Sequence, residues 1–352
     1  MSRPLAVVLF ALSIVFALSF PCSASITIPT VPVGDPGNVG EWSGVQAGGN
    51  GPSRICGAVG YAYNIGKYEV TVAQYTHFLN AVARTDTYGV YTSAMGRPNS
   101  QYGGCGITRS GTSGSYTYSV ATDFINRPVT FASFWNAVRF ANWLHNGQPT
   151  GLQNASTTED GAYYINGYNG RDGRTIQRKA GWKWAITSED EWYKAAYYKG
   201  GGTSAGYWDY PTRSNVAPGQ DMNDPSGNNA NYWTTPYNYP IDSGVYYTTV
   251  AGQFHNSASP YGTFDQGGNL FEYNDTVVST GADYAYRGYR GGSYASQETG
   301  LRASYRNYIY PDGSGNAGQI GFRVAAAIPE PSSLMILAGG VGMILGIRRR
   351  KA

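Results

Sequence analysis

Three segments of the chain predict amphipathic helices, because apolar residues recur in them with the 3.6-residue period of an α-helix. Each begins after a residue that can accept a backbone hydrogen bond at a helix N-terminus, namely Thr71, Ser133 or Ser188. Glu191 follows Ser188 by three residues and completes a capping box. Gly147 is expected just beyond the end of the second helix. The apolar positions on the three helices are Val72, Tyr75, Phe78, Leu79 and Val82; Phe134, Ala137, Val138, Ala141 and Leu144; and Trp192, Ala195 and Ala196.

Most of the remaining chain alternates short β-like runs, such as residues 246–250 and 322–325, with long loops rich in Gly, Asn, Asp, Ser and Tyr. Such long loops count against a regular architecture unless they carry function. Residues 25–54 are rich in Gly, Pro and Val without periodicity, which indicates an extended leader. We therefore expect one irregular, loop-rich α+β domain over residues 55–326, with Trp135, Trp143 and Trp192 in its core.

The first 24 residues have the organisation of a secretory signal peptide. Arg3 precedes an apolar run over residues 5–20, and Cys22-Ser23-Ala24 offers small residues to a signal peptidase. Phe20 and Pro21 occupy positions where a lipoprotein signal requires small residues, so lipidation of Cys22 is the weaker interpretation. The pattern predicts an exported protein whose mature chain begins near Ser25.

Residues 329–352 have a second targeting pattern. Pro329-Glu330-Pro331 is followed by an apolar stretch over residues 334–347 and a basic cluster over residues 348–351. The stretch is shorter than the ~20 apolar residues that span a bilayer, and positive-inside bias keeps the basic cluster cytoplasmic. The segment resembles a PEP-CTERM signal, which implies cleavage at Pro-Glu-Pro by a sorting transpeptidase, transient membrane contact, and a final place at the cell surface or matrix. A permanent tail anchor is the alternative.

Removing these ends changes the charge balance. Of 25 Lys and Arg, five lie in the two targeting segments, which leaves 20 basic residues against 22 acidic ones. No basic patch points to nucleic acid. The 31 Tyr and 48 Gly, with only 13% charged residues, are typical of a loop-rich extracellular fold. Cys56 and Cys105 could form a disulfide in an oxidising compartment or remain two buried thiols, and the sequence leaves both open.

Six segments in a fixed order resemble the formylglycine-generating enzyme, or sulfatase-modifying factor, family. The resemblance extends over some 260 residues and implies a compact fold related to C-type lectins, with little regular secondary structure. The segments are residues 63–71 (YNIGKYEVT), 127–137 (RPV leading to FWNA), 185–196 (AITSEDEWYKAA), 268–273 (GNLFEY), 290–294 (RGGSY) and 321–324 (GFRV).

The enzymes of this family oxidise a sulfatase cysteine with a copper ion held by two cysteines after the Arg-Gly-Gly-Ser element, and soft thiolates select Cu(I). The matching positions here are Ser296 and Leu301, and the sequence contains no cysteine after Cys105. We therefore expect no copper, no catalytic residues for this reaction, and no formylglycine-generating activity.

The resemblance also implies structural calcium. The family's spacing of ligands maps onto Asp265, Gly268, Leu270 and Glu272, with carboxylates at the ends and backbone carbonyls between them. The alternative for Glu272 is a buried carboxylate paired with an arginine such as Arg290 or Arg323. A second calcium site would use the ligands Asn231, the carbonyl of Tyr232, and Asp242.

Three functions remain open. A non-catalytic binding module for glycan or a surface protein would suit aromatic side chains on Gly/Asn loops. An oxidoreductase with different chemistry would need metal ligands, but His77, His145 and His255 have no ligand spacing, and structural roles are favoured for the first two. A structural component of an exopolysaccharide matrix is implied by the sorting tail alone.

Overall fold

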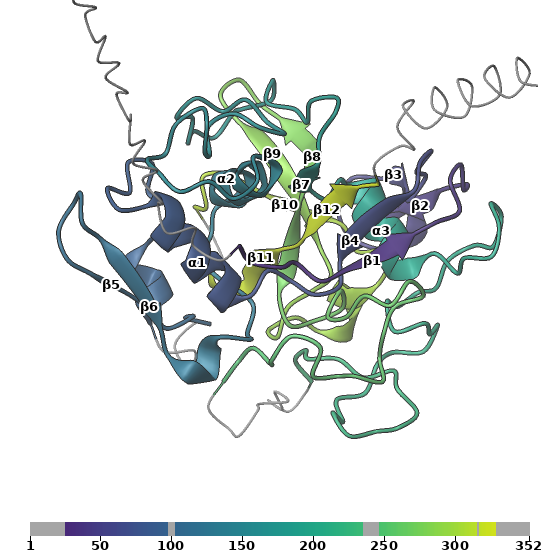
Figure 1. The fold of residues 1–352 in the computed structure, drawn as a ribbon. Coiled ribbons are helices and arrows are strands. Elements are labelled where there is room, and N and C mark those ends of the chain that lie inside the picture. The colour runs from purple at the N-terminus through teal and green to yellow at the C-terminus, as the bar shows by residue number, and fades with distance from the viewer. Residues whose placement is uncertain (1–24, 98–102, 235–245, 315–316, 329–352) are drawn as a thin grey trace, which may run out of the picture.

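Two four-stranded sheets and three α-helices organise the chain in the computed structural model, which describes residues 25–97, 103–234, 246–314 and 317–328 (Figure 1). The signal peptide, the sorting tail and Asp242 lie outside these residues. In the described ranges, no helix combines the length and apolarity needed to cross a membrane.

The first sheet joins the two ends of the described chain. Its order is β1-β4-β12-β7, and all three pairs are antiparallel. β1 pairs with β4 from Thr30 opposite Gly66 to Val33 opposite Tyr63. Part of the segment expected as an extended leader is therefore an edge strand of this sheet. The strands are β1 (Thr30–Val33), β4 (Tyr63–Gly66), β7 (Trp184–Ile186) and β12 (Val324–Ala327).

The second sheet has the order β10-β9-β8-β11, with β11 parallel to β8 and the other pairs antiparallel. The β-like run expected at residues 322–325 is divided between the two sheets, because Phe322 ends β11 and Val324 begins β12. Arg323 lies between them and is fully buried. The strands are β8 (Phe271–Thr280), β9 (Ala285–Arg290), β10 (Asn307–Ile309) and β11 (Ile320–Phe322).

All three predicted helices are confirmed, together with their caps: α1 (Val72–Val82), α2 (Phe134–His145) and α3 (Glu189–Tyr197). Thr71 accepts from the Gln74 amide, Ser133 from Asn136, and Ser188 from Glu191. Gly147 adopts φ +84° just after α2, where its amide donates to the carbonyl of Leu144. Side chains thus satisfy backbone groups that a helix end leaves unpaired.

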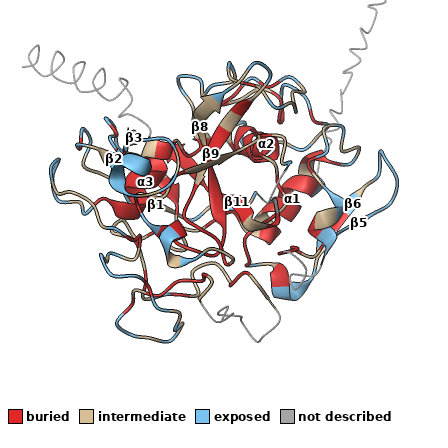
Figure 2. Ribbon diagram, turned by 180° about the vertical axis from the view of Figure 1, so that it is seen from behind, coloured by how far each residue is buried: buried red, intermediate tan, exposed pale blue. Residues whose placement is uncertain are grey.

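The main core packs α1 and α2 against strands of both sheets, and Figure 2 shows buried residues concentrated in the helices and in β9 and β11. Trp135, Trp143 and Trp192 are completely buried, as predicted. Cys56 and Cys105 are free, buried thiols in separate clusters, which settles the alternative in favour of two thiols.

Two peripheral hairpins and five 3-10 turns complete the regular structure of the described residues. The hairpins carry much of the exposed surface in Figure 2. These elements are β2 (Glu41–Ser43), β3 (Arg54–Cys56), β5 (Ile107–Ser110), β6 (Thr117–Val120), η1 (Val45–Ala47), η2 (Ser93–Gly96), η3 (Thr122–Phe124), η4 (Glu298–Leu301) and η5 (Ala317–Gln319).

The prediction of a β-like run at residues 246–250 is wrong, because this segment is irregular apart from a single bridge residue. Two of its backbone amides donate to side chains rather than to a neighbouring strand. The Thr249 amide donates to Oδ1 of Asn269 over 2.9 Å, and the Val250 amide donates to Oε1 of Gln253 over 3.1 Å. Such local amide acceptors offer the backbone an alternative to a sheet.

Candidate functional site

The loop after β9 places the two residues that occupy the copper-ligand positions. Gly291 and Gly292 both have positive φ, +99° and +77°. A Cβ at Gly292 would lie 2.6 Å from Cδ1 of Leu301, so the loop requires glycine to pack on this side chain. The sequence RGGS is therefore a close-packed turn against η4.

Neither of these positions can hold copper. Leu301 is completely buried in a cluster with Tyr210, Ala230 and Tyr232. The hydroxyl of Ser296 accepts a 2.9 Å hydrogen bond from the Ser293 amide. An alkyl chain and a turn-bonded hydroxyl provide no soft ligand for Cu(I), so the residues present do not fit this cofactor.

Glu272, expected as a calcium ligand, forms a buried ion pair with Arg323. Arg323 donates to both carboxylate oxygens, at 2.5 Å and 2.6 Å, and the Trp192 indole donates to Oε2 over 2.8 Å. All three side chains are completely buried. These contacts match the alternative interpretation of Glu272 as an arginine-paired carboxylate, and they already engage both of its oxygens.

The other residues of the first expected calcium site, Asp265, Gly268 and Leu270, lie in the loop before β8. The Asp265 carboxylate accepts from the Gly252 amide over 2.6 Å, and burial raises the pKa of Asp265 to about 6. The Leu270 amide donates to Glu69 over 3.2 Å. Gly268 has φ +83°, and a Cβ there would lie 2.2 Å from the carbonyl of Asn231, so this glycine permits a close approach of two backbones.

Asn231, expected in the second calcium site, has a buried side-chain oxygen that accepts no hydrogen bond. Its amide nitrogen donates to the carbonyl of Tyr247 and to Oδ1 of Asn269. The carbonyl of Tyr232 accepts from Gln220 and retains a second lone pair. The free oxygen of Asn231 is the feature here that fits a cation, because an unpaired buried carbonyl costs about 1–3 kcal/mol. Among the described residues, no group of three His, Cys, Asp or Glu side chains could hold a metal ion.

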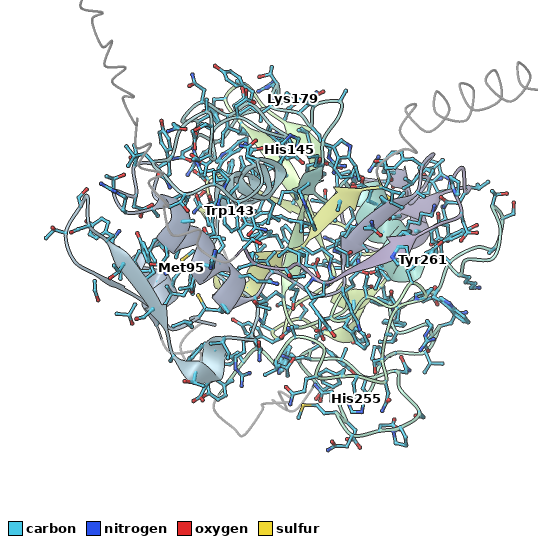
Figure 3. All side chains as sticks on the ribbon, in the orientation of Figure 1. Met95, Trp143, His145, Lys179, His255 and Tyr261 are labelled. Carbon is cyan, nitrogen blue, oxygen red and sulfur yellow. The ribbon has the colours of Figure 1, made fainter. Side chains whose placement is uncertain are left out.

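The three histidines have different contacts. His77, in α1, packs against Trp143 of α2, with ring centroids 5.9 Å apart. Burial lowers the pKa of His77. His145 ends α2 and accepts from the Lys183 amide over 3.1 Å. Figure 3 places His145 and His255 well apart in the molecule. Their positions agree with structural roles for His77 and His145.

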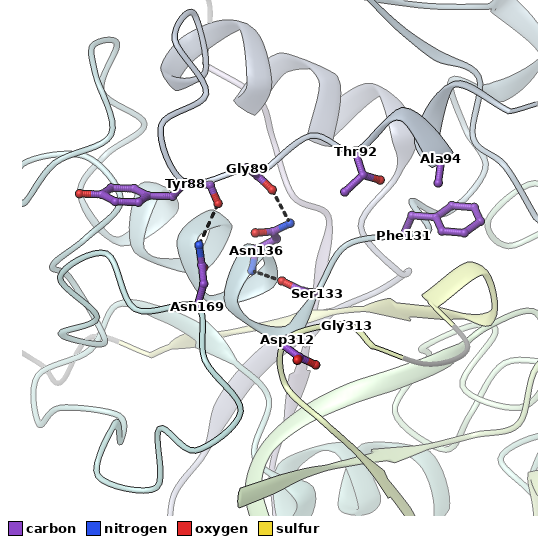
Figure 4. Close-up of a pocket in the computed structure, with 10 residues that line it drawn as sticks. All are labelled: Tyr88, Gly89, Thr92, Ala94, Phe131, Ser133, Asn136, Asn169, Asp312 and Gly313. Carbon is purple, nitrogen blue, oxygen red and sulfur yellow. Dashed lines mark hydrogen bonds between the residues drawn. The ribbon is translucent and has the colours of Figure 1, made fainter. Parts of the chain in front are cut away.

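A polar pocket of about 400 Å³ lies beside the N-terminus of α2 (Figure 4). Its lining combines amides, hydroxyls, one carboxylate and two aromatic rings. Tyr88 and Phe131 are half-buried. The lining residues are Tyr88, Gly89, Thr92, Ala94, Phe131, Ser133, Asn136, Asn169, Asp312 and Gly313.

Hydrogen bonds and packing fix the polar side of this pocket. Asn169 donates to the carbonyl of Tyr88 over 3.1 Å and accepts from Arg139 over 2.6 Å, and Asn136 donates to the carbonyl of Gly89 over 3.2 Å (Figure 4). The Arg139 guanidinium lies 4.8 Å from the centre of the Tyr88 ring. The amides are therefore held in place before any ligand binds, which reduces the entropy lost on binding.

Phe131 adopts φ +60°, a left-handed conformation that is unusual for a bulky residue. Strain of this kind costs about 1–3 kcal/mol and clusters at functional sites.

Sequence reasoning did not identify this pocket, because its residues come from segments 88–94, 131–136, 169 and 312–313, which share no periodic pattern. The one available signal was the polar pair Asn136 and Arg139 among the apolar residues of α2.

Comparisons with known proteins identify the family of the chain. No curated protein matches the chain. Among similar solved structures, CarF is 20% identical, with a TM-score of 0.49, and the match covers 86% of this chain and 99% of CarF. Treponema denticola variable protein 1 is 16% identical, with a TM-score of 0.45, and the match covers 88% of this chain and 100% of that protein. PvdO from Pseudomonas aeruginosa is 18% identical, with a TM-score of 0.44, and the match covers 85% of this chain and 92% of PvdO. The family model described as the sulfatase-modifying factor enzyme 1-like domain matches residues 56–328. This match covers the ordered resemblance and most of the chain, and the protein belongs to the formylglycine-generating-enzyme-like, or sulfatase-modifying factor, domain family.

Proposed function

We propose that this protein is an exported, non-catalytic binding module that takes glycan in the polar pocket beside α2. The observation that carries the non-catalytic part is the replacement of the copper-binding cysteines by Ser296 and Leu301, in a chain with no cysteine beyond Cys105. A relation to the C-type lectin fold, implied by the family resemblance, is compatible with such a role.

The pocket chemistry favours glycan as the ligand. Asn136, Asn169 and Asp312 provide amide and carboxylate groups that can bond sugar hydroxyls, while the rings of Tyr88 and Phe131 provide apolar faces. A few fixed polar groups among aromatic walls are typical of small-molecule sites.

The proposal that the domain is non-catalytic is tested by incubating it with a sulfatase-motif peptide, copper and oxygen. We expect mass spectrometry to find the peptide cysteine unmodified, because neither residue at the ligand positions offers a thiolate. Aldehyde formation above a control without protein would overturn the proposal that the domain is non-catalytic.

The binding part is tested with a glycan array. We expect the wild-type protein to bind a defined set of glycans, and Tyr88→Ala to weaken this binding, because it removes an aromatic wall. Trp42→Ala is the matched control, since Trp42 is a 47% exposed aromatic residue on β2 and does not line the pocket. Absence of binding by the wild type would contradict the glycan assignment.

We propose surface or matrix localisation after removal of both ends, on the basis of the signal-peptide pattern and the Pro329-Glu330-Pro331 element. Intact-mass measurement of protein from the native host should find a species that lacks Arg3 and residues 348–351. Recovery of only the full-length chain would overturn this part of the proposal.

A further inference from the structure

Four tyrosines form a continuous aromatic patch on β9 and β10 of the second sheet and on the residues that adjoin these strands. We call Tyr284, Tyr286, Tyr308 and Tyr310 the tyrosine patch. Tyr286 lies at the centre, with its ring centroid 4.8 Å from Tyr284, 4.9 Å from Tyr308 and 4.5 Å from Tyr310. All four side chains are partly exposed. Hydrogen bonding with Tyr310 raises the pKa of Tyr286 to about 12.

Strand geometry explains why these rings share one face. Alternate residues of a strand point to opposite faces, and β9 pairs with β10 with Tyr308 opposite Gly288 and Ile309 opposite Arg287. The intervening residues pack inward: Arg287 is buried with its guanidinium 4.7 Å from the centre of the Phe134 ring, and Ile309 packs on the main core. The core therefore does not account for the tyrosines on the other face.

The patch is continuous with the pocket beside α2. Asp312 lines the pocket and accepts a 2.8 Å hydrogen bond from Arg171. The Arg171 guanidinium in turn lies 4.6 Å from the centre of the Tyr310 ring. These contacts connect the pocket to the patch, and the two charges at the border form an ion pair with each other.

We propose that the tyrosine patch is an extended binding surface for an uncharged polysaccharide whose chain continues from the pocket beside α2. This proposal rests on the glycan-binding function proposed above and adds the second contact region.

The chemistry of the patch selects this ligand class. Its apolar area is aromatic, and each ring carries a hydroxyl that can donate to or accept from a sugar hydroxyl. Large exposed aliphatic side chains, which a protein partner would cover, occur elsewhere in the described residues, at Val39, Val45, Ile55, Leu152, Val216 and Ile328. Because the border charges compensate each other, a neutral polymer complements the surface better than a polyanion does.

The proposal is tested by affinity electrophoresis of protein purified from the native host, in native gels that contain the host's own exopolysaccharide, hydroxyethylcellulose, dextran or yeast mannan. We expect at least one polymer to retard the wild type, and Tyr286→Ala/Tyr310→Ala to weaken that interaction about tenfold. Trp42→Ala should bind within a factor of two of the wild type. Thermal unfolding of each variant verifies that it is folded.

The outcomes separate the two proposals. Retardation that is lost in the double tyrosine variant, and kept in Trp42→Ala, supports the patch. Equal retardation of the double variant overturns the patch and leaves glycan binding in the pocket intact. Failure of all four polymers to retard the wild type contradicts the polysaccharide assignment, whereas a positive glycan array would still support the pocket. Capture of a protein through these tyrosines, with no polysaccharide binding, also overturns the proposal.

Discussion

At the scale of single residues, Glu189, at the start of α3, lies at the centre of a buried arginine cluster. Three arginines donate to its buried carboxylate: Arg54 over 3.0 Å, Arg290 over 2.8 Å, and Arg306 over 2.6 Å and 2.8 Å. Burial alone would raise the pKa of Glu189, but these arginines outweigh it and lower the pKa to about 2. The carboxylate therefore joins α3 to β3, β9 and the segment before β10.

This ion network predicts a specific loss of stability in acid. A pKa lowered from 4.5 to about 2 in the folded protein means that the folded state favours the ionised carboxylate. Its contribution, about 3 kcal/mol, is complete above pH ~4.5 and is lost as the pH falls toward 2. Urea unfolding between pH 7 and 2 should show a flatter pH dependence for Glu189→Gln than for the wild type. Asp283→Asn, at an exposed acid, should keep the wild-type slope; a wild-type slope in Glu189→Gln would contradict the assignment.

Backbone strain at Phe131 gives a second prediction. Its φ of +60° costs any residue with a Cβ about 1–2 kcal/mol, and glycine largely avoids this cost. Phe131→Gly and Phe131→Ala both remove the ring, so their difference reports the backbone. We expect Phe131→Gly to be more stable than Phe131→Ala by about 1 kcal/mol in urea unfolding. Equal stability, or greater stability of the alanine variant, would mean that position 131 is not strained.

The calcium prediction can be tested at the level of individual ligands. We propose that Asn231 binds the ion through its unpaired oxygen, so calcium should raise the melting temperature of the wild type by mass action. Asn231→Ala should lose this response. Glu272→Gln should lose about 3–5 kcal/mol of unfolding free energy with or without calcium, because it disrupts the buried pair with Arg323. If chelator leaves the wild type unchanged, no structural calcium is present.

At the scale of elements, local sequence was sufficient for the helices and insufficient for the strands. Helix caps act over three residues, so Thr71, Ser133 and Ser188 could be identified directly. The structure of residues 322–325 and 246–250 could not be identified in the same way, because strand partners come from distant segments. The first run divides between two sheets at Arg323, whose buried position depends on Glu272, 51 residues earlier.

The caps provide a quantitative test of this local control. Ser188→Ala removes the acceptor for the Glu191 amide, and such changes cost about 1 kcal/mol. We expect urea unfolding to find this loss, while Ser119→Ala, at an exposed position of β6, changes stability by less than about 0.5 kcal/mol. A Ser188 variant as stable as the control would show that tertiary contacts, rather than the cap, determine where α3 begins.

At the scale of the whole molecule, the family could be predicted from six segments in a fixed order, and the family match over residues 56–328 covers all six. The pocket could not, because it forms only when segments separated by more than 200 residues meet. The tyrosine patch could not, because it depends on the pairing of β9 with β10. Asp312 illustrates this: it lines a pocket with Tyr88 and pairs with Arg171, and neither contact has a sequence pattern.

The position of β4 between β1 and β12 bears on how the chain is made. β4 is formed by residues near the start of the domain, and its partner β12 ends at Ala327. The ribosome must therefore synthesise nearly the whole domain before the first sheet can close, and such non-local pairing is intrinsically slow. A chain that cannot complete its fold until its last strand arrives stays unfolded during its synthesis, and an unfolded chain is compatible with the export proposed above.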